Sequence, residues 1–139
     1  MSDVEMLKGL IELPQPEAAL LLEAGYLYME MGKPAEAAEV FAGVVALLPH
    51  SDVPLVALGN LEFSQGHFQR ALKHHQDALK VRPDSALAQA HAGEALLWLK
   101  KTDEGKAALG KAIAMDPAGA PAQFAQALLD AHQQGALAR

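Results

Sequence analysis

The chain has 139 residues, and its 11 Lys and Arg against 17 Asp and Glu give it a formal charge of −6. This length predicts one domain with a substantial core, and the acidic balance argues against a nucleic-acid partner, which would need clustered Lys and Arg. Because the sequence has no cysteine, it excludes disulfide scaffolds, thiolate zinc sites and cysteine nucleophiles. The 51% of hydrophobic residues provides enough apolar surface to fold.

The N-terminus has neither a basic region nor the apolar run of a secretory signal. The longer apolar stretches, such as residues 41–48, fall far short of the ~20 residues that a membrane span needs. We therefore expect a cytoplasmic protein with no membrane span. The first predicted element is a short helix over residues 3–13, which stops at Leu13-Pro14-Gln15-Pro16. Its apolar stripe, formed by Val4, Leu7, Leu10 and Ile11, could support a homodimer.

The rest of the chain repeats with a period of 34 residues. Glycines recur at Gly25, Gly59 and Gly93, and prolines recur with the same spacing. One column holds large residues, namely Phe41, His75 and Leu109. Two columns hold mostly small residues, namely Ala37, Ala71 and Gly105, and Val44, Ala78 and Ala112. The proline column is Pro49, Pro83 and Pro117. A glycine inside a helix costs about 1 kcal/mol relative to alanine, so three at one position indicate the close approach of a neighbouring helix.

Each repeat is predicted to be a helix, a tight turn and a second helix. Gly32 and Gly66 end the first helix of their repeats, whereas Lys100 takes this place in the third. The proline column ends the second helix, because proline cannot continue it. The predicted pairs are 17–31 with 34–48, 52–65 with 68–81, and 85–100 with 103–115, followed by a last helix over 121–134 that stops at Gly135. No segment alternates with the period of a strand, so the fold is predicted to be all-α.

These columns resemble the tetratricopeptide repeat (TPR). The first repeat has Leu21, Ala24-Gly25, Tyr28, Ala37, Phe41, Val44 and Pro49, and lacks only the frequent Trp of that signature. The third repeat departs from it at Gln89 and Gly105. The resemblance implies a right-handed α-solenoid in a single domain, divided into an N-terminal helix (1–16), three repeats (18–51, 52–85 and 86–119) and a capping helix (120–139).

In a TPR array the first helix of each repeat lines a concave groove. Carried over to this sequence, the family's groove positions predict a partner-binding surface made of Leu22, Tyr26, Met29, Val56, Asn60, Phe63, Leu87, His91, Glu94 and Trp98. Packing between helices is an equally good interpretation for Leu22 and Val56. The clamp of Lys, Arg and Asn that grips a C-terminal carboxylate in cochaperones is not present, because Leu22, Leu87 and His91 replace its cations. An apolar surface remains, on which Asn60 is free to bond a peptide backbone.

Histidines are the candidates for chemistry. His67, His74 and His75 fall on one predicted helix, but no carboxylate pattern completes a metal site, and His75 occupies the large-residue column of the core. His91 and Glu94 form only a lone acid–base pair. We therefore expect no metal, no cofactor and no enzymatic activity.

The sequence supports two functional hypotheses. The first is a chaperone or adaptor that holds a peptide or helix of a partner protein in the groove. More narrowly, the repeat number, length and charge resemble the TPR class of type III secretion chaperones, which keep secretion substrates soluble in the bacterial cytoplasm. The alternative is a scaffold or assembly protein that self-associates through the N-terminal helix and has no chaperone role.

Overall fold

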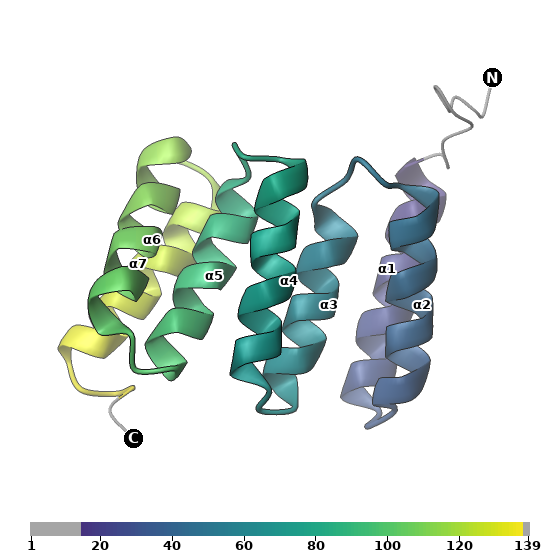
Figure 1. The fold of residues 1–139 in the computed structure, drawn as a ribbon, viewed down its shortest axis with the longest axis horizontal. Helices are drawn as coiled ribbons and strands as arrows, with labels where there is room; N and C mark the ends of the chain where they lie inside the picture. Colours follow the sequence, from purple (N-terminus) through teal and green to yellow (C-terminus); the bar gives the residue numbers. More distant parts are fainter. Residues whose placement is uncertain (1–14, 138–139) are drawn as a thin grey trace.

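The computed structural model describes residues 15–137, and within this range every regular element is an α-helix (Figure 1). The helices are α1 (Gln15–Glu30), α2 (Pro34–Leu47), α3 (Val53–Ser64), α4 (Phe68–Val81), α5 (Ala86–Trp98), α6 (Thr102–Met115) and α7 (Ala120–Gln133). Each begins and ends within two residues of the helix predicted from the repeat. The expected N-terminal helix, residues 3–13, lies outside the described residues. None of the described helices is both long and apolar enough to cross a membrane.

The first helix of each repeat ends in the same backbone motif. At the end of α1, the N–H of Gly32 donates to the carbonyl of Met29 at 3.0 Å, and the N–H of Lys33 donates to that of Tyr28 at 2.8 Å. This Schellman motif needs a left-handed residue, and Gly32 has a φ of 73°. The same bonds follow α3 and α5, where Gly66 has a φ of 81° and Lys100 a φ of 66°. The predicted stop is confirmed, and Lys100 adopts the glycine conformation despite its Cβ.

The glycine column permits close packing of the two helices within each repeat. A Cβ on Gly25 would overlap the ring of Phe41, and a Cβ on Gly59 would overlap the ring of His75. The third repeat packs the side chain of Leu109 against Gly93 in the same way. Phe41, His75 and Leu109 are at most 1% exposed. The close approach predicted from the glycines is thus confirmed, and one large side chain fills each space.

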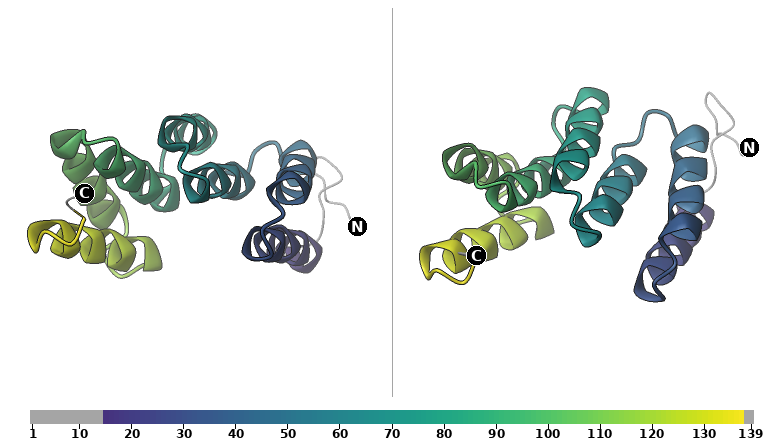
Figure 2. Two further views of the ribbon diagram at one scale, coloured as in Figure 1. Left: turned by 90° about the horizontal axis from the view of Figure 1, so that it is seen from below. Right: turned by 60° about the horizontal axis from the view of Figure 1, so that its bottom comes forward.

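The helices form two layers, and the array curves towards one of them. Helices α1, α3, α5 and α7 each contact the next member of their own layer, whereas α2, α4 and α6 contact members of the first layer and not one another. The array therefore bends towards the α1, α3, α5 and α7 side, and Figure 2 shows both ends of the arch turned that way. We call α1, α3, α5 and α7 the inner layer. The architecture is the helical-repeat solenoid that the sequence predicts.

Candidate functional site

Tyr26 and Asn60 join the first two inner-layer helices. The amide Nδ2 of Asn60 on α3 donates a hydrogen bond to the Tyr26 hydroxyl on α1 at 3.1 Å. The Tyr26 ring meets Phe41 edge-on at a centroid distance of 5.1 Å and remains 37% exposed. Partial burial raises the pKa of the Tyr26 phenol and the Asn60 bond lowers it by less, so the hydroxyl stays neutral near pH 7. The pair therefore presents a hydroxyl donor and the Asn60 carbonyl acceptor.

Asn60 is partly engaged rather than wholly free. One N–H of its amide donates to Tyr26, because the two residues lie 34 positions apart and successive inner helices bring equivalent positions together. The second N–H of the amide and its carbonyl oxygen remain to bond a peptide backbone.

Aromatic side chains join the second and third inner helices. The Phe63 ring on α3 lies 5.2 Å from Trp98 on α5, in an edge-on arrangement, and 4.9 Å from Phe68 at the start of α4. Phe63 and Trp98 are both partly exposed. Phe63 also packs against the core cluster of Ala71 and Leu72, and Trp98 packs against that of Leu109. The part of each ring that stays exposed is available to apolar side chains of a ligand.

His91 joins the third inner helix to the last. Its ring lies 4.7 Å from that of Phe124 on α7 and stacks on His75 of α4 at 5.6 Å. His91 Nδ1 is 3.2 Å from a carboxylate oxygen of Glu94, and both side chains keep about a sixth of their surface, 16% and 15%, exposed. The pair adds polarity to the surface.

The remaining predicted positions differ in exposure. Leu22 and Met29 are half-buried against the core that includes Ala37 and Phe41. Leu87 is half-buried against the core of Val56, Ala78 and Ala88. Val56 itself is only 2% exposed, so its assignment to the binding surface is corrected: packing by α4 and α5 makes it a core residue.

Phe124 was missed by the sequence reasoning. It is partly exposed on α7 and contacts His91, so it extends the surface to the end of the array. The repeat could have identified it, because Phe124 lies 34 residues after Ala90. It therefore continues the column of Leu22, Val56 and Ala90. We call the accessible set the inner face; it comprises Leu22, Tyr26, Met29, Asn60, Phe63, Leu87, His91, Glu94, Trp98 and Phe124.

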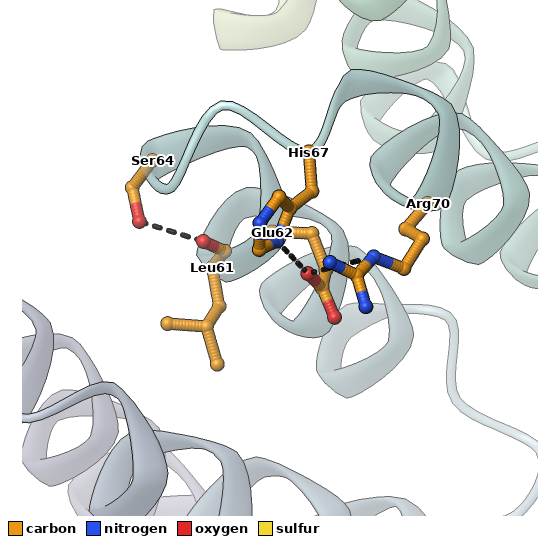
Figure 3. A network of polar contacts seen from close by, with 5 residues as sticks. All are labelled: Leu61, Glu62, Ser64, His67 and Arg70. Carbon is orange, nitrogen blue, oxygen red and sulfur yellow. Dashed lines mark hydrogen bonds and ion pairs between the residues drawn. The ribbon is translucent and has the colours of Figure 1, made fainter.

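A polar network fixes the turn that carries Phe63. A Glu62 carboxylate oxygen lies 2.8 Å from His67 Nδ1 and 3.6 Å from Arg70 Nε (Figure 3). In the same turn, the Ser64 hydroxyl donates to the Leu61 carbonyl at 2.6 Å. His67 is therefore paired with a carboxylate of its own turn, which holds the end of α3 against the start of α4 and supports the position of Phe63.

His75 is a buried residue, as its column predicts. It is 1% exposed, and neither ring nitrogen has a hydrogen-bond partner. Burial, followed by the nearby His91 and His74, lowers the pKa of His75 from 6.5 to about 3. The ring is therefore neutral near pH 7 and acts as a core side chain. Among the described residues, no group of three or more His, Asp or Glu side chains is arranged to hold a metal ion.

Comparisons with known proteins point to one family. Residues 19–51 match the family model of the tetratricopeptide repeat. A comparison with curated protein sequences finds no match.

Solved structures share the fold at low sequence identity. PcrH from Pseudomonas aeruginosa is 24% identical with a TM-score of 0.71, over 92% of this chain and 98% of that one. The Yersinia enterocolitica type III secretion chaperone SycD, in complex with a peptide of the translocator YopD, is 18% identical with a TM-score of 0.68, over 88% and 96% of the chains. The first TPR domain of Spaghetti (RPAP3), bound to the HSP90 peptide SRMEEVD, is 22% identical with a TM-score of 0.66, over 86% and 98%.

The match and the shared fold together bear out the resemblance to the TPR family. The family model covers one repeat, and the solved structures extend the TPR fold over most of the chain. TPR domains of this fold bind peptides in two of the structures above.

Proposed function

We propose that this chain is a protein-binding TPR module, a chaperone or adaptor whose inner face holds a segment of a partner protein. The observation that carries the proposal is the run of side-chain contacts along successive inner helices, from Tyr26–Asn60 through Phe63–Trp98 to His91–Phe124. These contacts join partly exposed aromatic rings on successive inner helices. Oriented, half-buried aromatic residues lose little entropy on binding and are typical anchors of protein interfaces.

The inner face favours a partner segment with apolar anchors over an acidic C-terminus. Its ten residues include no Lys or Arg and one acidic residue, Glu94. Leu22, Leu87 and His91 stand where a carboxylate clamp would need cations. A peptide that ends in several carboxylates would therefore bring its charges to a surface that cannot pair them. We expect apolar side chains of the partner to pack on Phe63 and Trp98, with its backbone bonded by Tyr26 and Asn60.

The narrower version of the proposal is a type III secretion chaperone that works in the bacterial cytoplasm. The support is the shared fold with SycD and the apolar character of the inner face. Co-expression with candidate translocator proteins tests this version. It predicts that a translocator stays soluble only when this chain is present and precipitates with a Tyr26→Ala, Phe63→Ala variant. If every translocator stays insoluble with both forms, the narrower version is wrong and the general one stands.

Selection of peptides from a random library on the immobilised chain tests the general proposal. We expect selected peptides to share two or more large apolar residues and to bind equally with a free or an amidated C-terminus. Peptides that bind the wild type and the Tyr26→Ala, Phe63→Ala variant equally would contradict it. The peptide SRMEEVD serves as the negative control and should not bind.

A further inference from the structure

Helix α1 carries an apolar stripe that the described part of the chain leaves uncovered. Leu20, Leu27 and Met31 are 66%, 55% and 54% exposed, and Ala24 between them is exposed too. Their spacing of four, three and four residues places them on one side of the helix. Among the described elements, α1 contacts only α2 and α3. We call these four residues the α1 stripe.

The positions of Leu20 and Leu27 are buried in the later repeats, whereas Gln65, at the position of Met31, is exposed. Leu61 occupies the repeat position of Leu27 and is 5% exposed, in one core cluster with Ala37 of α2. In the third repeat, Ala88 and Ala95 occupy the positions of Leu20 and Leu27 and are fully buried. On α4, Ala78 shares a core cluster with Ala88, and Ala71 and Leu72 share one with Ala95. The second helix of one repeat thus covers the Leu20 and Leu27 positions of the next.

Residues 1–14 include a segment at the repeat position of such a covering helix. Helix α2 (Pro34–Leu47) ends at Leu47, and the position 34 residues earlier is Leu13. The sequence predicts that the helix over 3–13 ends at this same residue. Leu10 then takes the position of Ala78, and Val4 takes the position of Leu72. Glu5 takes the position of Glu39 and Lys73, which are both exposed. Val4 and Leu10 therefore fall at covering positions and Glu5 falls at a solvent position, whereas Asp3 takes the place of the buried Ala71.

We propose that residues 3–13 form a helix that packs antiparallel on the α1 stripe and caps this end of the array. The register follows from the third repeat, where Ala78 shares a core cluster with Ala88 and Leu72 shares one with Ala95. By the same register, the proposed helix places Leu10 beside Leu20 and Val4 beside Leu27. Leu10 and Leu20 are ten residues apart in sequence, as are Ala78 and Ala88.

The connection and the tether support this occupant over a second copy of the chain. Helix α1 begins three residues earlier in the repeat than α5, so the chain must reverse near Leu13 and Pro14. A residue before a proline avoids the helical region, which favours a reversal there. A segment tethered directly to α1 acts at an effective concentration in the millimolar range, which free copies of the chain do not reach.

Pairs of engineered cysteines test the proposal in the full chain, because the sequence has no cysteine of its own. A disulfide forms only when two Cβ atoms come within about 4.5 Å. Val4→Cys with Leu27→Cys is the test pair, and Glu5→Cys with Leu27→Cys is the matched control, displaced by one residue. We expect the test pair to form an intramolecular disulfide at least tenfold faster than the control, as measured by thiol titration and non-reducing electrophoresis.

A second pair and an isotope mixture complete the test. Leu10→Cys with Leu20→Cys should also close within one chain, which keeps the test valid if the first pair disturbs folding. Oxidation of mixed heavy and light protein, followed by mass spectrometry, separates links within a chain from links between chains. Equal rates for test and control pairs would overturn the proposal. Predominant heavy–light links would overturn it too, and would assign the α1 stripe to a second copy.

Discussion

The amide nitrogen of Asn60 donates to the hydroxyl of Tyr26 across two helices, from positions 34 residues apart in the sequence. The two residues therefore occupy the same position in successive repeats. Their bond couples the orientation of the exposed Tyr26 ring to α3. On the proposed function, it leaves the Tyr26 O–H, the second Asn60 N–H and the Asn60 carbonyl ready for the backbone of a bound segment.

A double-mutant cycle of Tyr26→Phe and Asn60→Ala measures this bond. Because the pair is partly exposed, we expect a coupling of about 0.5–1 kcal/mol in the free energy of unfolding. Urea denaturation of the wild type, the two single variants and the double variant provides the four values. Additive single effects would mean that the bond is not formed in solution.

His75 makes the stability of the chain depend on pH. Its pKa is about 3 in the fold against 6.5 unperturbed, so between these values the unfolded chain binds a proton that the folded chain does not. The stabilisation is therefore complete above pH 6.5 and is lost as the pH falls towards 3, by about 2 kcal/mol at pH 5. Chemical denaturation from pH 7 to pH 5 measures the loss.

His75→Leu should remove this part of the pH dependence. Leu109 fills the same position in the third repeat, so a leucine fits opposite the glycine of the column. The variant should also gain about 1–3 kcal/mol at pH 7, because two buried ring nitrogens without partners disappear. An unaltered slope for His75→Leu would show that another group titrates.

Gly59→Ala should destabilise the fold, whereas Gly110→Ala should not. A Cβ at Gly59 overlaps the His75 ring, and relieving such overpacking costs about 1–3 kcal/mol. A Cβ at Gly110 of α6 meets no atom within 4 Å, so the variant should gain about 1 kcal/mol from helix propensity. Thermal unfolding followed by circular dichroism compares the two. Equal shifts in Tm would refute the packing role of the glycine column.

Lys100→Gly should stabilise the chain. Lys100 has a φ of 66°, a region that costs an ordinary residue about 1–2 kcal/mol and a glycine almost nothing. Lys101→Gly is the matched control, because Lys101 has a φ of −90° and gains nothing from glycine. Both variants remove one lysine, so a rise in Tm restricted to Lys100→Gly isolates the backbone effect. A rise of the same size in both would point to charge instead.

The repeat predicted the fold more fully than it predicted the site. A period of 34 residues places every helix and explains why Gly25 faces Phe41, because local conformation and pair packing recur in each repeat. Exposure does not recur in the same way. Leu22 is half-buried at the end of the array, whereas Val56 at the same repeat position is covered by α4 and α5.

Contacts between repeats also lay beyond the sequence pattern. The Tyr26–Asn60 bond depends on how far α1 approaches α3, which the curvature of the array determines. Phe124 was overlooked because the last helix was treated as a cap rather than as a further inner helix at the same repeat position.

The affinity of one library-selected peptide for three forms of the chain tests the central claim most directly. Titration calorimetry should show at least a tenfold weaker Kd, about 1.4 kcal/mol, for the Tyr26→Ala, Phe63→Ala variant than for the wild type. Leu47→Ala removes an apolar side chain that is 49% exposed from α2, outside the inner layer, and should leave the Kd unchanged. Circular dichroism confirms that all three forms are folded. An unchanged Kd in the inner-face variant, or a loss of affinity in Leu47→Ala alone, would contradict the account.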